Sequence, residues 1–173
     1  NKLSNYKKLM DEAEKSDYTP LPEKVDYLFK VTKVEIVYTD EKSSMGADVP
    51  YIKYTATVQE SANGEGGGRP VFGVIFPYRL SQKTGEVRLQ QDALKKVARL
   101  IGVEPDIEAS AEDKEALVTE LVGILDNAEF AAKVKNVVRK DKDTKEPLLD
   151  DEGKPRVNTR FIEVRRPEEF NAG

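Results

Sequence analysis

Apolar and polar residues alternate along several segments of the chain, a pattern typical of half-buried β-strands. In residues 25–39 the apolar positions change parity near Thr32 and Lys33, which predicts a bulge in a long first strand. In residues 51–59 the alternation predicts a second strand. The core-facing side chains of that strand would be Ile52, Tyr54, Ala56 and Val58.

Three further strands follow from the same alternation and from turn residues between them. The glycine-rich segment 61–68 predicts a flexible hairpin that leads into a third strand over residues 69–80, with Pro77 at its edge or end. Residues 130–140 and 156–165 predict the fourth and fifth strands, joined by a long polar turn.

Between the third and fourth strands the apolar period changes to that of a helix. Residues 94–101 carry an i, i+3, i+4, i+7 stripe, and Gly102 stands where a helix C-cap is common. A second helix is expected to open at Ser110, whose hydroxyl would cap amides near Asp113. The spacing in residues 5–15 predicts a short amphipathic helix before the first strand.

This order of elements predicts a mainly β fold, a five-stranded OB-type Greek-key barrel with a helical insert between strands three and four. The expected divisions are an N-terminal helical extension (residues 1–20), the OB-fold domain (21–167) and a C-terminal tail (168–173). We expect the tail to be frayed, as short chain ends commonly are.

Composition narrows the function. The chain has no His and no Cys, which removes imidazole and thiolate from catalysis and metal binding. No set of carboxylates is placed to converge on metal ions, so a nuclease or other hydrolase is disfavoured and we expect no catalytic residue, metal or cofactor. The longest apolar run is too short to span a membrane, and no signal peptide is visible, so we expect a soluble cytoplasmic protein.

Cations and aromatic residues interleave on the segments that form the ligand-binding face of an OB-fold: strands two and three and two of the loops. This combination is typical of proteins that bind single strands, because cations follow phosphates and aromatic rings stack on bases. The candidate nucleic-acid-binding residues are Lys42, Ser44, Tyr51, Lys53, Arg69, Phe72, Tyr78, Arg79, Arg88, Lys135, Arg139, Lys140 and Arg160.

A structural interpretation of the same residues stays open. Taken singly, Phe72 and Phe76 are expected in the core, because large apolar residues are mostly buried. Tyr51 and Tyr78 sit beside cations at strand ends, where core and surface are equally expected. The acidic run at residues 150–152 opposes phosphate binding unless its loop folds away from the groove.

Several segments together resemble those of phage-encoded OB-fold proteins. They are Lys42-Ser-Ser-Met-Gly46, Tyr51-Ile-Lys-Tyr, Gly68-Arg-Pro-Val-Phe72, Leu94-Lys-Lys-Val-Ala-Arg-Leu-Ile-Gly102 and a closing strand over residues 158–167. That family is associated with single-stranded DNA binding in phage replication and recombination. By the resemblance, the matching positions are Lys42, Ser43, Ser44, Gly46, Arg69, Val71 and Phe72.

The sequence therefore favours non-catalytic binding of single-stranded DNA in phage-type replication or recombination, in the host cytoplasm. Replication or recombination proteins are further candidate partners, and homo-oligomer formation stays open. The alternative is a protein-protein interaction module of such a complex, which the net charge of −4 favours.

Overall fold

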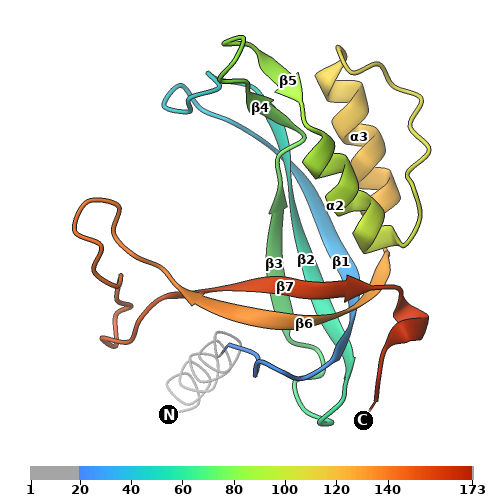
Figure 1. The fold of residues 1–173 in the computed structure, drawn as a ribbon, viewed down its shortest axis with the longest axis vertical. Coiled ribbons are helices and arrows are strands. Elements are labelled where there is room, and N and C mark those ends of the chain that lie inside the picture. Colours follow the sequence, from blue (N-terminus) through green and yellow to red (C-terminus); the bar gives the residue numbers. More distant parts are fainter. Residues whose placement is uncertain (1–19, 173) are drawn as a thin grey trace, which may run out of the picture.

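A computed structural model describes residues 20–172. Its main element is a five-stranded antiparallel sheet with the strand order β3-β2-β1-β6-β7. These strands are β1 (Tyr27–Tyr38), β2 (Pro50–Ser61), β3 (Pro70–Ile75), β6 (Glu129–Val138) and β7 (Val157–Arg165). The pair β6 and β7 crosses the lower part of β1, β2 and β3 (Figure 1). The prediction of a mainly β fold is confirmed.

Two helices, α2 (Gln91–Ile101) and α3 (Lys114–Leu125), lie side by side on one side of the sheet (Figure 1). α3 packs against β1 and β2, and α2 contacts β6 and β7. The core fills the space between helices and sheet. Its largest fully buried side chains include Tyr27, Phe29, Ile52, Leu121 and Phe130.

The strand alternation found in the sequence is confirmed. In β1 the side chains of Tyr27, Phe29 and Val31 are buried, and the register with β2 shifts between Val31 and Lys33, as the predicted bulge requires. In β2 the predicted core set is buried throughout: Ile52, Tyr54, Ala56 and Val58.

The third predicted strand is shorter than expected. β3 ends at Ile75, and after Pro77 the chain forms a separate hairpin of β4 (Tyr78–Leu80) and β5 (Val87–Leu89). Proline has no amide hydrogen to donate to a strand ladder, so the chain leaves the sheet there. The prediction of one strand over residues 69–80 is therefore wrong.

Both helices are present, with one boundary moved. α2 ends at Gly102, whose φ of 80° lies in the left-handed region, so the predicted C-cap is confirmed. α3 begins later than predicted. Asp113 is its N-cap and accepts a hydrogen bond from the Ala116 amide at 3.2 Å, whereas Ser110 only accepts one from the Glu112 amide in the preceding turn.

The C-terminal segment is held against the start of β1. After β7, a 3-10 turn η1 (Pro167–Glu169) brings the Asn171 amide to Asp26, to which it donates at 2.8 Å. Asp26 is buried and also pairs with the Arg165 guanidinium. The expectation of a frayed tail is thus wrong for residues 168–172, because a buried carboxylate fixes it.

The predicted helix over residues 5–15 lies outside the described residues. No helix among residues 20–172 is long and apolar enough to cross a membrane.

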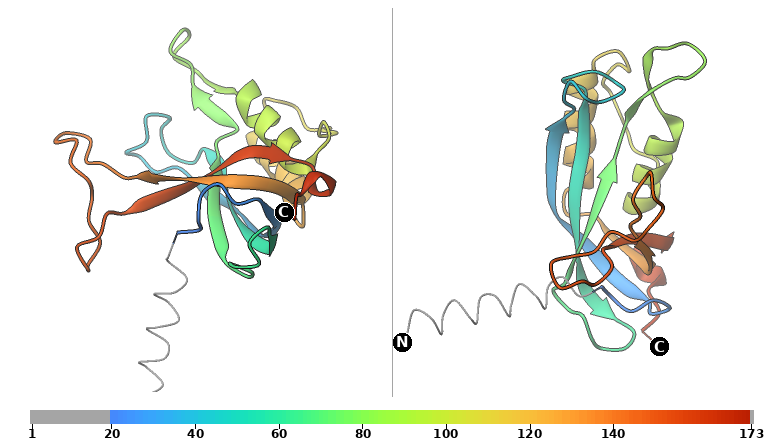
Figure 2. Two further views of the ribbon diagram at one scale, coloured as in Figure 1. Left: turned by 60° about the horizontal axis from the view of Figure 1, so that its bottom comes forward. Right: turned by 90° about the vertical axis from the view of Figure 1, so that its left-hand side faces the viewer.

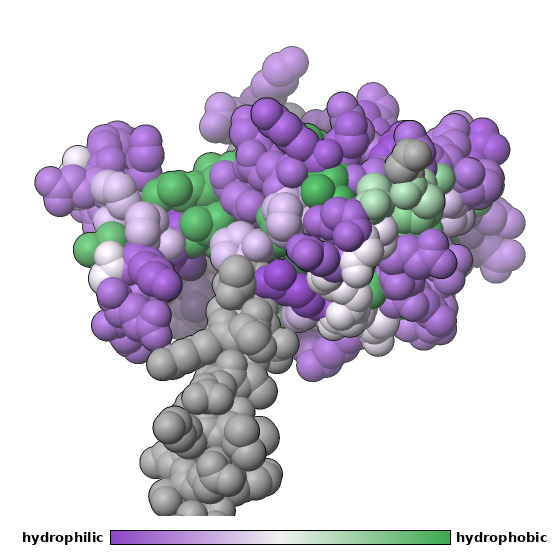
Figure 3. Space-filling view, turned by 90° about the horizontal axis from the view of Figure 1, so that it is seen from below, coloured by the Kyte–Doolittle hydropathy of each residue, from purple (hydrophilic) through white to green (hydrophobic). Residues whose placement is uncertain are grey.

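The connection between β6 and β7, residues 139–156, extends from the body as a long arm (Figures 1 and 2). We call it the β6–β7 arm. Asp141 accepts backbone hydrogen bonds from Asp143 and Thr144, and Asp150 accepts them from Glu152 and Lys154. These carboxylates therefore form the turns of the arm. Seen from below, hydrophilic side chains cover most of the visible surface, and apolar surface gathers where the arm joins the body (Figure 3).

Candidate nucleic-acid interface

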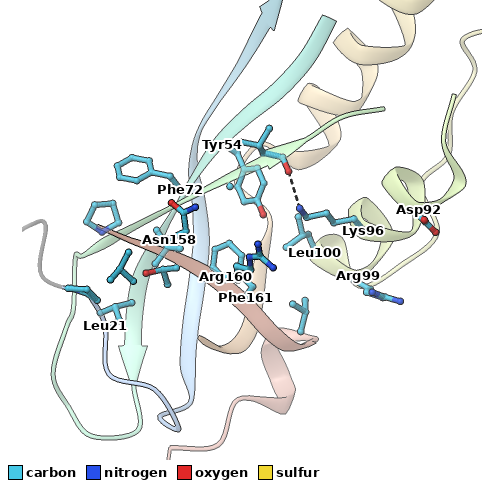
Figure 4. A pocket seen from close by; sticks show the side chains of 18 of the residues that line it. Leu21, Tyr54, Phe72, Asp92, Lys96, Arg99, Leu100, Asn158, Arg160 and Phe161 are labelled. Carbon is cyan, nitrogen blue, oxygen red and sulfur yellow. Dashed lines mark hydrogen bonds between the residues drawn. The ribbon is translucent and has the colours of Figure 1, made fainter. Parts of the chain in front are cut away.

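A groove of about 900 Å³ lies between the two outer strands of the sheet and helix α2. We call it the β3–β7 groove. Its walls are residues 70–74 of β3, residues 157–161 of β7 and four residues of α2, and Tyr54 of β2 also lines it (Figure 4). Because β3 and β7 are at opposite ends of the strand order, the groove separates two sheet edges that do not pair with each other.

Glycine in β3 shapes one wall of this groove. Gly73 pairs with Tyr54 across the β2–β3 ladder, and the Tyr54 ring lies over the place where a side chain of Gly73 would stand. Lys96 joins the other wall to the same strand, since its Nζ donates to the Val74 carbonyl oxygen at 2.9 Å (Figure 4). The positions of Tyr54 and Lys96 are thus both set by β3.

Four cations line the groove: Arg79, Lys96, Arg99 and Arg160. Within residues 20–172 none of them forms an ion pair, although Asp92 also lines the groove. Lys96 keeps exposed surface, yet burial lowers its pKa, and the Arg79 and Arg160 guanidinium groups lower it further. Within residues 20–172, the groove therefore holds four positive charges that repel one another and that form no ion pair.

The hydroxyl of Tyr54 has no hydrogen-bond partner among the described residues. The side chain is 2% exposed, and its hydroxyl oxygen is buried. Burial raises the pKa of Tyr54, so the hydroxyl is neutral at pH 7 and able to donate. Tyr54, Lys96 and Arg160 point toward one another from β2, α2 and β7 (Figure 4).

Several predicted residues lie in the groove or on the sheet face beside it. Phe72 and Arg79 line the groove with Arg160, and Phe72 is 67% exposed, so its expected place in the core is wrong. Tyr51 stacks on Phe76 with ring centroids 4.7 Å apart, and the Arg79 guanidinium carbon lies 5.5 Å from the Phe76 ring centroid.

Two more predicted cations flank this region. Lys53 is exposed on β2 opposite Val74, and Lys135 is exposed on β6 directly opposite Arg160.

Tyr78 is a correction to the predicted site. It is 1% exposed, and its hydroxyl donates to the Ala111 carbonyl oxygen at 2.6 Å. A ring buried in this way has no face on which a base can stack, so the prediction for Tyr78 is wrong. Its large apolar ring instead anchors the β4–β5 hairpin to the segment before α3.

The other predicted residues are spread over the molecule. Arg88 lies on β5 and pairs with Glu86, with an N–O distance of 3.2 Å. Arg69 is half-buried after the glycine-rich hairpin, and its Nη2 has no hydrogen-bond partner in the part of the chain that the structure describes. The remaining residues are exposed on the β1–β2 loop and the β6–β7 arm, which lie apart in Figure 1, and none of them lines the groove: Lys42, Ser44, Arg139 and Lys140.

Sequence reasoning missed three groove residues. Tyr54 was assigned to the core, which is true of its ring, and Lys96 and Arg99 were assigned to a helix without a role. A signal was available, since Lys96 and Arg99 are three residues apart and so share one face of α2. Without the position of β7, nothing in the sequence indicated that this face meets Arg160.

Comparison of the chain with protein-family models, curated proteins and solved structures finds no match. Among residues 20–172, the acidic side chains form no group of three or more placed to hold a metal ion.

Proposed function

We propose that this protein binds single-stranded DNA without catalysing a reaction, in the β3–β7 groove and on the adjoining face of β2 and β3. The observation that carries the proposal is a set of cations that form no ion pair within residues 20–172 and that share a groove with an exposed aromatic ring. Arg79, Lys96, Arg99 and Arg160 line the same groove as Phe72. Cations that follow phosphates and rings that stack on bases are the two requirements for binding a single strand.

The charges of the groove support an anionic ligand. Positive side chains held close together repel each other, and partial burial increases the cost of each charge. A bound phosphate would relieve both costs for Lys96 and the repulsion for Arg160. The net charge of −4 belongs to the whole chain, whereas the lining of the groove has four cations and a single carboxylate, Asp92.

The exposed rings favour a single strand over a duplex. Stacking on an aromatic side chain contributes about 1–3 kcal/mol per base, but only for bases that are not already stacked inside a helix. Phe72 offers its ring to solvent at the groove. The Tyr51–Phe76 pair, with Arg79 against it, offers a second aromatic platform on the same side of β3.

We further propose that the fold is an OB-type barrel. The strand order β3-β2-β1-β6-β7 is the order of a five-stranded Greek-key barrel, in which the two outer strands meet to close the barrel. Here β3 and β7 would be those strands, and the groove follows their seam. Together with the sequence resemblance, this supports a role in phage-type replication or recombination in the host cytoplasm.

The test is fluorescence anisotropy of labelled oligo-dT and of a matched duplex across a salt series. We expect tighter binding of the single strand, with an affinity that falls as salt rises. Lys53→Glu combined with Arg79→Glu should weaken binding strongly. The matched control is Lys83→Glu with Lys95→Glu, which makes the same change in net charge at exposed residues that do not line the groove. Equal affinity of the two double variants would contradict the proposed location, and no binding by the unmodified protein would contradict the function.

The second candidate function is docking on a partner protein. The β6–β7 arm favours it, since Leu149 is 54% exposed on the arm and Val138 is 38% exposed at its base. A partner captured through apolar contacts would stay bound at high salt and after nuclease treatment, whereas contacts to phosphates weaken steeply with salt. Leu149→Ser should abolish capture of that kind and leave oligo-dT binding unchanged.

A further inference from the structure

We propose that Tyr54, Lys96 and Arg160 together hold one backbone phosphate of the bound strand in the β3–β7 groove. This inference rests on the proposed function and adds a specific site to it. Three donors from β2, α2 and β7 point toward one another there (Figure 4). We call the three side chains the phosphate clamp.

The Tyr54 hydroxyl is the strongest argument for the clamp. A buried polar group without a hydrogen bond destabilises a fold, and buried polar groups are nearly always paired. Phenylalanine would fill the same space without this cost. The ring is held by Gly73 behind it and stacks near Phe161, with ring centroids 6.2 Å apart, so the hydroxyl cannot simply turn toward another partner. A ligand oxygen in the groove would accept a hydrogen bond from this hydroxyl.

The two cations complete the clamp from opposite walls. Lys96 is fixed on one wall through its hydrogen bond to the Val74 carbonyl oxygen. Arg160 extends from β7 on the other wall, and Lys135 lies opposite it on β6. Arg and Lys are the usual phosphate ligands, Arg because its planar fork donates two parallel hydrogen bonds and Lys as a point charge.

The presence of Phe72 in the same groove indicates that the ligand of the clamp is a backbone phosphate of a nucleic acid strand. Phe72 lines the same groove, but its ring lies on the opposite face of β3 from Tyr54 (Figure 4). A strand that crosses the edge of β3 would place a base on this ring and a neighbouring phosphate in the clamp. A carboxylate of an acidic peptide would use the charges but would leave the exposed ring unexplained.

The decisive variant is Tyr54→Phe in the full chain, which removes only the hydroxyl oxygen. We expect the unfolding midpoint in urea to be unchanged or higher, because an unpaired buried hydroxyl is lost. We expect the affinity for oligo-dT to fall about tenfold or more, because a hydrogen bond to a charged group is lost. The slope of log K against log salt should not change, because no charge is removed. Stability and affinity would then move in opposite directions, which a merely structural tyrosine would not produce.

Lys96→Met and Lys95→Met form a matched pair on α2. Both remove one positive charge, but Lys95 does not line the groove. We expect Lys96→Met to weaken oligo-dT binding and to reduce the salt slope by about 0.7, the value for one single-strand phosphate. Lys95→Met should leave the slope nearly unchanged. Equal slopes for the two variants would overturn the clamp.

Oligo-dT with one neutral methylphosphonate at successive positions identifies the phosphate itself. The unmodified protein should lose affinity most at one position, and Tyr54→Phe should lose much less there, because its contact is already absent. If oligo-dT binds but Tyr54→Phe binds it equally well, the clamp is wrong and the proposed function stands. If only poly-glutamate binds, and Tyr54→Phe weakens that binding, the ligand is an acidic peptide and the clamp for phosphate is wrong. If oligo-dT does not bind at all, the proposed function is wrong, and the clamp that rests on it is wrong as well.

Discussion

Replacing Gly73 by alanine tests how the groove is built, because the sign of the effect on stability depends on the Tyr54 ring. Gly73 has no positive φ, so alanine is compatible with its backbone. At a compatible site this change stabilises a protein by about 0.4–1 kcal/mol through the unfolded state. In this structure, however, the new methyl carbon would lie 2.5 Å from Cε1 of Tyr54 and closer still to Cζ and Oη.

Such distances are far shorter than an ordinary van der Waals contact of about 3.5–4 Å between carbon atoms. The ring is buried, so it must either push its neighbours or leave its place over β3. Overpacking of this kind costs about 1–3 kcal/mol. We therefore expect Gly73→Ala to lower the free energy of unfolding by about 1–3 kcal/mol, measured by urea denaturation.

A second substitution identifies the clash as the cause. Leucine at position 54 lacks the three ring atoms that the methyl group would meet, so Gly73→Ala should be neutral or stabilising in a Tyr54→Leu background. The two changes should be strongly non-additive in a double-mutant cycle. A stabilising effect of Gly73→Ala in the unmodified protein, or additivity of the pair, would refute this account of the groove wall. Oligo-dT affinity should fall with Gly73→Ala, since the displaced ring carries the Tyr54 hydroxyl.

Three other predictions follow from residues around the groove and the chain ends. Phe72→Ala should weaken oligo-dT binding by about 1–3 kcal/mol in anisotropy while the urea midpoint stays nearly constant, because the exposed ring stacks on a base but packs on little protein. Asp26→Asn should lower the free energy of unfolding by about 2–3 kcal/mol in urea denaturation, less than the loss of a fully buried ion pair, because Arg165 is partly exposed. An unchanged urea midpoint would contradict this prediction. Oligo-dT affinity should fall as pH rises through the pKa of Lys96, because the cationic form of the side chain binds. This pKa lies below the 10.5 of a free lysine, and the Lys96→Met variant should not show this pH dependence. The other ionisable side chains that line the groove are Tyr54, Arg79, Asp92, Arg99 and Arg160.

Local patterns in the sequence were sufficient to predict those strands and helices that bury one face. The parity change at Thr32 located the bulge in β1, and Gly102 located the end of α2, because both depend on neighbours in the chain. The start of α3 was missed because Ser110 and Asp113 are both good caps, and only the backbone path decides which one is used.

The groove could not be predicted because it depends on contacts between distant segments. Phe72 was expected in the core because it is large and apolar, but it lies on an outer strand and is exposed. For Tyr78, core and surface were equally expected from the sequence. It is buried because Pro77 turns the chain out of the sheet and toward the helices. Arg160 and Lys96 are 64 positions apart in the chain (160 − 96), and only the fold brings them to one groove.

The central place of β1 has a consequence for synthesis of the chain. One edge of β1 pairs with β2, which follows it directly, whereas its other edge pairs with β6, where Tyr27 meets Ala132. On the ribosome this second edge stays open until the helices and β6 have been made, and an open strand edge can pair with another chain. Asp26, next to that edge, likewise waits for Arg165 and Asn171. The nascent protein is therefore most dependent on chaperones before β6 emerges, and chains that terminate before Glu129 should be recovered in aggregates.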